Sequence, residues 1–395
     1  MSAAITLRGV AWDHPRATAP LLASIPEYRQ LRAAAGQQVE IVWEARSLKD
    51  FGDAPIDELA QRYDLLIIDH PHIGVAAQTG CLLPLETLLD AELLDVLASQ
   101  SAGPSHASYH EGGHQWALAI DAATQAAAYR SDLLDEGRVR AAGQSWDAAL
   151  ELARQLRGEG LWAAVPLAPT DAVCGFLSLC ASLGEAVGTG EGGWVSQSVA
   201  LAALTLLRRW RDLSCPDAWA WNPIQTFDAM SRRSDLAYCP LAFIYSNYAR
   251  NGFRPHLLRF ADLPGVRGSC LGGTGVAVSA FSQFRHEAAR YAAWLCSAGV
   301  QSGLYVRCGG QPGNALAWTN AEANALTHDF FRDTLATVTA AHVRPRGPGW
   351  PPFQEEAGNA IHAWLLADQG DAAALSSRLR DAFFSGLHPA SLSSP

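Results

Sequence analysis

The stretch from Leu271 to Trp318 constrains the fold of this 395-residue chain more than any other segment. It reads LGGTGVAVSAFSQFRHEAARYAAWLCSAGVQSGLYVRCGGQPGNALAW. A glycine-rich entry is followed by an apolar strand over Gly275–Ser279, then by an amphipathic helix, and last by a polar Gly-Pro exit. A strand that feeds a helix in this way predicts a mixed α/β fold.

The chain also begins with a strand–helix–strand pattern. Ile5–Ala11 and Val39–Trp43 have the pattern of strands, Ala17–Ala35 is helical, and Leu65–Ile68 is a third apolar run that ends in DHPH. Parallel strands joined by helices bind ligands at their carboxyl ends. The residues that follow the first and third runs are therefore candidate ligand contacts: Asp13, His14, Asp69, His70 and His72.

Three further segments follow in a definite order: YDLLIIDHPHIGVAAQTGCLLPLE at 63–86, GGHQWALAIDAATQAAAYRSDLL at 112–134 and SWDAALELARQL at 145–156. Together with 271–318, they resemble the extracellular solute-binding proteins of ABC importers, of the carbohydrate type. The resemblance implies a two-lobed, periplasmic-binding-protein-like type II fold with a hinge and an interlobe cleft. It implies a first α/β lobe of residues 1–118 plus 275–318 and a second of 119–274 plus 319–395, with crossings near Ala119 and Thr274.

Two departures from the family concern the ligand. The second lobe has AMSRRSDLAYCPLAFIYSNYA where the family shows a short Gly-x-Ala-Ala-Met segment and a Trp-bearing loop, and Arg130 stands where the family prefers Asn. These departures leave open whether the solute is a sugar or another polar or anionic molecule.

Composition excludes several classes of function and bears on the compartment. The net charge of −10 and a pI near 5.6 argue against nucleic-acid binding, which needs clustered Lys and Arg. No apolar run reaches the roughly 18–20 residues of a transmembrane helix, and MSAAITLRGVAWDHP lacks the regions of a signal peptide. Eight cysteines without a CxxC pair read as buried reduced thiols. We therefore expect a cytoplasmic protein, or a periplasmic or extracellular one if a signal peptide was removed.

The candidate catalytic and metal motifs are weak. HEGGH at His110–His114 matches a zinc-protease pattern, but two central glycines disfavour the helix that this pattern needs. The Asp and His residues at the strand ends suit polar binding better than a metal, although a metal site there stays open. No GxSxG elbow is present, and Cys239 reads as a core thiol. We expect no catalytic residue, no metal and no cofactor.

The function predicted from the sequence is binding of a small polar solute, either for an ABC transporter, with its permease as partner, or as a cytosolic relative. The alternative is a cytosolic enzyme on the same two-lobed fold that acts on a small polar or anionic metabolite. Aromatic faces give large contact areas, so Trp221 and Tyr245 join the candidates. The full set of expected ligand contacts is Asp13, His14, Asp69, His70, Asp121, Trp221, Tyr245, Gly273, Thr274 and Arg307.

Overall fold

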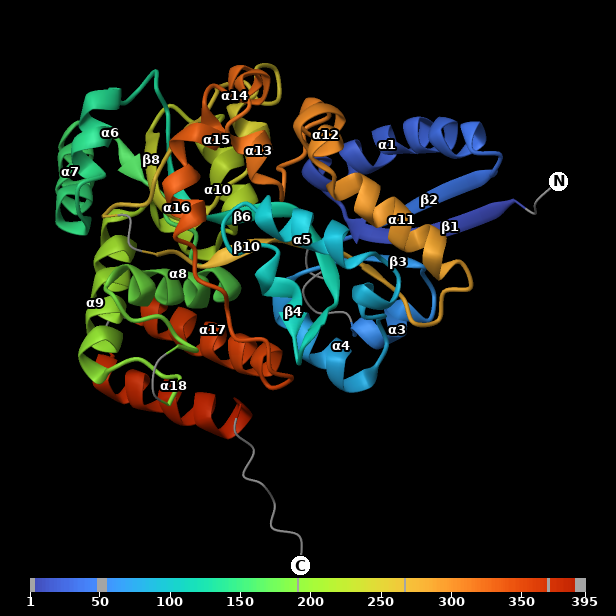
Figure 1. Ribbon diagram of the computed structural model, residues 1–395. Helices are drawn as coiled ribbons and strands as arrows, with labels where there is room; N and C mark the ends of the chain where they lie inside the picture. Colours follow the sequence, from blue (N-terminus) through green and yellow to red (C-terminus); the bar gives the residue numbers. More distant parts are fainter. Residues whose placement is uncertain (1–3, 48–54, 190–191, 266–267, 368–369, 388–395) are drawn as a thin grey trace, which may run out of the picture. The chain divides into compact units, whose positions relative to one another are not determined.

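The structure is a computed structural model that describes residues 4–47, 55–189, 192–265, 268–367 and 370–387 (Figure 1). The chain forms two compact units. Unit 1 comprises Met1–Ala122 and Gly272–Phe331, and unit 2 comprises Ala123–Leu271 and Arg332–Pro395. Residues 319–331, which the resemblance assigns to the second lobe, thus group with unit 1.

Unit 1 contains these elements in chain order: β1 (Ile5–Trp12), α1 (Pro15–Ala34), β2 (Val39–Arg46), α3 (Ile56–Ala60), β3 (Leu65–Ile68), η1 (His70–His72), α4 (Ile73–Thr79), η2 (Leu85–Thr87), α5 (Ala91–Ser99), η3 (Ala107–Tyr109), β4 (His110–Glu111), β5 (His114–Gln115), the first part of β6 (Ala117–Tyr129), most of β10 (Leu271–Val278), α11 (Arg285–Cys296), α12 (Ala298–Val300), η6 (Gln301–Tyr305), α13 (Ala315–Trp318), α14 (Ala321–Leu326) and the start of α15 (Phe330–Asp333).

Unit 2 contains the rest of β6 and then α6 (Glu136–Ala142), α7 (Trp146–Gly158), β7 (Trp162–Ala163), α8 (Pro169–Ser182), α9 (Gln197–Leu213), η4 (Pro216–Ala220), α10 (Pro223–Met230), β8 (Leu236–Phe243), η5 (Ser246–Ala249), β9 (Arg259–Ala261), the rest of α15, α16 (Leu335–Thr339), α17 (Trp350–Leu366) and α18 (Ala372–Leu387).

The sheet of unit 1 is sandwiched between helices because its strands alternate their side chains. In β3, Leu65 and Ile67 join the cluster that contains α1 and α11, whereas Leu66 and Ile68 join the one that contains α3 and α4. Both faces are apolar, as a sheet covered on both sides requires. Figure 1 shows α1 and α11 on one side of these strands and α3 and α4 on the other.

Strand pairing in unit 1 is partly parallel and partly antiparallel. β1 pairs with β2 and β3 in parallel, and β10 returns antiparallel to β3 with Gly275 opposite Ile68. The strand order is β2-β1-β3-β10-β6, continuing to β8 and β7, with β9 also on β6. The path is continuous because β6 is the neighbour of β10 and also pairs, over Gln125–Tyr129, with β8.

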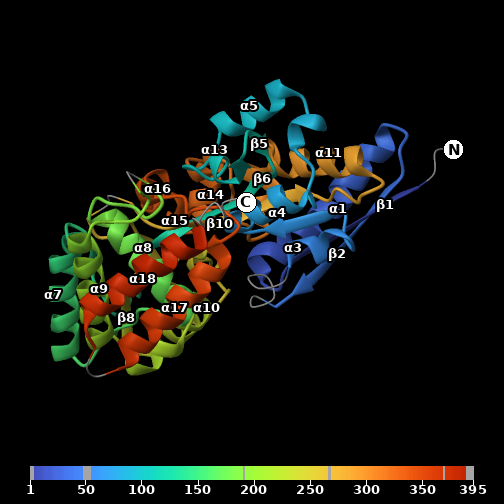
Figure 2. The same cartoon turned by 90° about the horizontal axis from the view of Figure 1, so that it is seen from below.

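Unit 2 has its own core. Residues of α7, α8, α9, α17 and α18 form one buried cluster with β7 and β8. Figure 2 labels these five helices and β8 in unit 2. Ser145 caps α7 by accepting from Ala148 N at 3.1 Å. Helix α6 starts at Glu136, because the Asp135 side chain caps it there. Within the described ranges, every helix is too short or too polar to cross a bilayer.

Candidate functional site

The carboxyl ends of β1 and β3 lie at the same edge of the unit 1 sheet, because the two strands are parallel. Asp13 and His14 follow β1, and Asp69 and His70 follow β3. Thr274 precedes Gly275 on the antiparallel β10, so it lies one residue beyond the Ile68 pairing at the same edge. We call this set of residues the unit 1 edge. His14 and His70 are buried there, whereas Asp13 is exposed.

The DHPH segment that follows β3 does not continue the strand. Residues His70–His72 form a 3-10 turn with Pro71 in its first positions, where the fixed φ of proline suits a helix start. The Asp69 carboxylate accepts from His70 N at 2.8 Å and lies 3.2 Å from His70 Nδ1. The buried His70 ring meets Tyr109 edge-on, with centroids 6.3 Å apart. The turn therefore fixes both side chains relative to β3.

The glycines of β10 have conformational roles. Gly273 has φ +98°, which residues with side chains rarely adopt. A Cβ on Gly275 would lie 2.8 Å from the Tyr109 ring and 2.9 Å from the Cβ of Ala117. Position 275 requires glycine because of close packing, and position 273 favours glycine because of its left-handed backbone. By contrast, Thr274 is 4% exposed, and none of the described residues hydrogen-bonds its Oγ1.

Asp121 forms a buried ion pair with Arg16. Arg16 Nε donates to Asp121 Oδ2 at 2.8 Å, and Nη2 donates to Oδ1. Both side chains are at most 4% exposed. Burial raises the pKa of Asp121, and the Arg16 guanidinium opposes that rise. Both carboxylate oxygens already have a partner within unit 1, so Asp121 anchors β6 to the start of α1.

Arg307 lies just after η6 on unit 1. Its side chain is exposed, and its Nη1 lies 3.4 Å from the position that a Cβ on Gly303 would take. No described residue forms an ion pair or a hydrogen bond with its guanidinium.

Unit 2 has a comparable edge where β7 and β8 end, since these two strands are parallel. Tyr245 follows β8 and is 8% exposed, with its ring perpendicular to that of Tyr248 at 6.5 Å. Trp221 O accepts from Ala168 N at 3.2 Å, in the segment that leaves β7. The Trp221 side chain is partly exposed. Trp221 and Tyr245 thus belong to segments at the same sheet edge, the unit 2 edge.

Arg130 has a structural role. It is 1% exposed, pairs bidentately with Asp132 at 2.7 Å, and donates to the carbonyls of Met230 and Arg233 at the end of α10. The pairing with Asp132 also lowers the pKa of that carboxyl. Arg130 is therefore occupied within unit 2, so its presence does not itself indicate an anionic ligand.

Asp171, in the first turn of α8, is a titratable group that the sequence reasoning missed. It is 6% exposed, and its carboxyl has no hydrogen bond or ion pair with any residue in the described ranges. Burial raises its pKa from 3.8 to about 8. No sequence signal marks it, because an acid in a first helical turn normally reads as a solvent-exposed dipole partner.

The cysteines are built into the cores. All are buried except the partly exposed Cys308, and the structure joins none of the eight, which all lie in described ranges, in a disulfide. Burial raises the pKa of Cys239 to about 12, so its thiol is a poor nucleophile.

We expect about one cysteine to react with Ellman's reagent in the native protein and all eight after unfolding without reductant. The native count follows from the burial of seven thiols. A total of zero after unfolding would mean four disulfides and would reverse this assignment.

The zinc-protease alternative fails on geometry. His110–Glu111 and His114–Gln115 form a hairpin, β4–β5, around Gly112 and Gly113, which both have positive φ. Glu111 pairs in register with His114, and His114 Nδ1 hydrogen-bonds Glu86. Among the described residues, no group of three His, Cys, Asp or Glu side chains is arranged to hold a metal ion.

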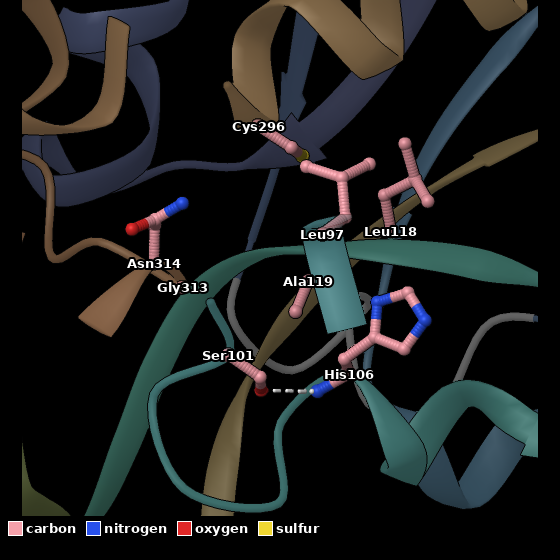
Figure 3. Close-up of a pocket in the computed structure, with 8 residues that line it drawn as sticks. All are labelled: Leu97, Ser101, His106, Leu118, Ala119, Cys296, Gly313 and Asn314. Atoms are coloured by element: carbon pink, nitrogen blue, oxygen red, sulfur yellow. Dashed lines mark hydrogen bonds between the residues drawn. The ribbon is translucent and has the colours of Figure 1, made fainter. Parts of the chain in front are cut away.

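One small pocket in unit 1 cannot hold a solute. It has a volume of about 10 Å³ and lies among Leu97, Ser101, His106 and Asn314, with other lining residues drawn in Figure 3. That volume suits about one water molecule. Burial, with a smaller effect of His110, lowers the pKa of His106 to about 4, so its ring is neutral.

No protein-family model matches the chain. Solved structures do match it over nearly its full length. The maltose-bound MalE3 of T. maritima has a TM-score of 0.81 at 19% identity, covering 97% of this chain and 100% of that one. The chain has the fold of ABC-transporter solute-binding proteins.

Two further matches extend this comparison. A solute-binding protein from Agrobacterium radiobacter, solved with ribitol, has a TM-score of 0.76 at 17% identity and covers 95% of this chain and 97% of that one. One from Thermotoga lettingae, bound with alpha-D-tagatose, has a TM-score of 0.77 at 14% identity, covering 96% and 100%. The type II fold predicted from the sequence is confirmed. At these identities the likeness concerns the fold.

Proposed function

We propose that the chain is a binding protein for a small, neutral, polyhydroxylated solute, as a solute-binding protein of an ABC transporter or a relative of one. The observation that carries the proposal is the full-length match to proteins solved with maltose, ribitol and tagatose. If the chain serves an importer, its protein partner is the permease.

The charges of the described site residues favour a neutral solute. Arg16 is neutralised by Asp121, and Arg130 by Asp132, so neither arginine is available as an anion receptor. Asp69 and Thr274 offer oxygen atoms suited to hydroxyl groups. Trp221 and Tyr245 offer aromatic faces that suit the C–H faces of a polyol or a sugar ring. We propose Asp69, Thr274, His14 and His70 as ligand contacts on unit 1, and Trp221 and Tyr245 as ligand contacts on unit 2.

We expect one of maltose, ribitol, D-tagatose or D-mannitol to raise the melting temperature. A ligand at one hundred times its Kd stabilises the native state by about 2.7 kcal/mol. Asp69→Asn should abolish most of the shift, since a hydrogen bond to a charged group is worth about 1.5–3 kcal/mol. Asn can still accept from His70 N, so the 3-10 turn is preserved.

The matched control is Asp95→Asn, an exposed carboxylate on α5 of the same unit. It should leave the shift unchanged. A shift of equal size in the wild type and in Asp69→Asn would show that Asp69 is only structural. The same samples should be followed for chemical turnover, because consumption of a compound would favour the alternative of an enzyme on this fold.

A further inference from the structure

A groove of about 380 Å³ lies on unit 1, away from the edge residues in sequence. One wall is a single face of α11, formed by His286, Arg290, Ala293, Trp294 and Ser297 at helical spacing. The other wall is the segment that enters α5, with Leu88, Leu89, Asp90 and Leu93. Its volume falls within the roughly 300–1,000 Å³ typical of small-molecule sites.

The floor of the groove is apolar and well supported. Leu88, Leu89, Leu93 and Trp294 are partly buried and pack against the core of unit 1. The Trp294 ring is stacked on Tyr291 with centroids 6.1 Å apart and is tilted against Tyr28 at 5.1 Å. The aromatic wall is therefore held in place before any ligand arrives, which lowers the entropic cost of binding.

The groove carries the positive charge of Arg290, whose guanidinium can donate further hydrogen bonds. Arg290 Nη1 donates to Glu287 at 3.2 Å, but Glu287 is already held by Arg32 at 2.7 and 2.9 Å and by the Tyr28 hydroxyl at 2.7 Å. No described residue accepts from Arg290 Nε or Nη2. The Arg290 side chain is 56% exposed, so it can turn toward an added carboxylate.

The groove also carries the negative charge of Asp90, whose carboxylate does not cap the helix that it precedes. Asp90 is the N-cap residue of α5, yet its side chain makes no capping hydrogen bond. Among the described residues it has no ion-pair partner, and it is not paired with Arg290 across the groove. Two opposite charges thus flank one apolar floor without neutralising each other.

We propose that this groove binds a zwitterion with an apolar side chain, such as a free hydrophobic amino acid. The carboxylate of the ligand pairs with Arg290, its ammonium group pairs with Asp90, and its side chain lies on Trp294 and the leucines. This site is separate from the solute site proposed above and does not depend on it.

L-phenylalanine is the probe, titrated against the full-length protein by ligand-detected NMR. We expect saturable binding with a Kd of about 1 mM or tighter, corresponding to about −4 kcal/mol. N-acetyl-L-phenylalanine and L-phenylalaninamide each lack one charge and should bind about fivefold more weakly, as should glycine, which lacks the side chain. A factor of five corresponds to about 1 kcal/mol, the upper value for an exposed ion pair.

Arg290→Gln and Asp90→Asn should each weaken L-phenylalanine binding about fivefold. Arg285→Gln on α11 and Asp95→Asn on α5 are exposed residues outside the groove and should leave binding unchanged. The two groove variants must also respond differently. Arg290→Gln should no longer distinguish L-phenylalanine from its amide, and Asp90→Asn should no longer distinguish it from the N-acetyl compound.

The absence of saturable binding at 10 mM, or equal binding to wild type and both groove variants, would overturn the proposal. So would a dimer in sedimentation that Leu93→Asp splits, because the groove would then be an interface between copies. Failure of the melting-temperature panel leaves this test intact, since L-phenylalanine is measured directly.

Discussion

Replacing Arg16 with methionine lowers the free energy of unfolding by about 3–5 kcal/mol. The substitution leaves the Asp121 carboxylate 1% exposed without a counterion, and burial already raises the pKa of this group against the effect of Arg16. A charge that is buried and uncompensated must either be hydrated at the expense of packing or take up a proton. Urea unfolding at pH 7 measures the loss.

Two controls separate this effect from the simple loss of a long side chain. Arg29 pairs with Glu40 on the surface, with both side chains 51% exposed, so Arg29→Met should cost at most about 1 kcal/mol. The double variant Arg16→Met with Asp121→Leu should recover much of the stability, because no charge remains buried. A single-variant loss below 1 kcal/mol would contradict the buried-pair description.

Asp171→Asn should stabilise the protein by about 2–4 kcal/mol at pH 7. The pKa of Asp171 is 3.8 in the reference state and about 8 in the folded protein, and a tenfold difference in proton affinity is worth about 1.4 kcal/mol. At pH 7 the unfolded chain has released the proton that the folded chain keeps, so ionisation favours unfolding. Asparagine does not ionise, so the Asp171→Asn variant does not lose this stability. The position in the first turn of α8, where the helix dipole favours a negative charge, reduces the gain.

The sign of the pH dependence is the sharper test of the Asp171 prediction. Below pH 4 both states hold the proton and the two proteins should be equally stable. Between pH 4 and pH 8 the wild type should lose stability relative to Asp171→Asn, and above pH 8 the difference should stay constant.

Asp147 has a similar place in the first turn of α7, but its side chain is 85% exposed. Asp147→Asn should change stability by less than about 1 kcal/mol without this profile. An unchanged or destabilised Asp171→Asn would contradict the buried-acid account.

Sequence patterns predicted the fold of this chain well where strands are short and buried. The strand over Leu65–Ile68 and the strand that contains Gly275 both follow from local apolar runs, and the structure has both as β3 and β10. Local sequence does not indicate the length of β6, because the alanine-rich run after Ile120 has little strand propensity of its own. Tertiary pairing with β8 and β9 makes it a strand.

The candidate residues were harder to predict, since the sequence gives their place along the chain but not their partners. Asp121 is on a strand near a crossing, as expected, yet its carboxylate is used by Arg16, which is 105 residues away in the sequence. The burial of Asp171 depends on the packing of α8 in the core of unit 2, which no local pattern reports. Both cases require knowledge of long-range contacts.

Isothermal titration calorimetry with maltose, ribitol, D-tagatose and D-mannitol tests the central claim most directly. The proposal predicts that the wild type binds at least one of them with a 1:1 stoichiometry. It also predicts that Asp69→Asn at the unit 1 edge and Trp221→Ala at the unit 2 edge each weaken that binding at least about tenfold, a loss of about 1.4 kcal/mol, while Asp95→Asn binds normally. Binding that neither edge substitution weakens, or no binding of any neutral polyol alongside tight binding of an anion, would contradict it.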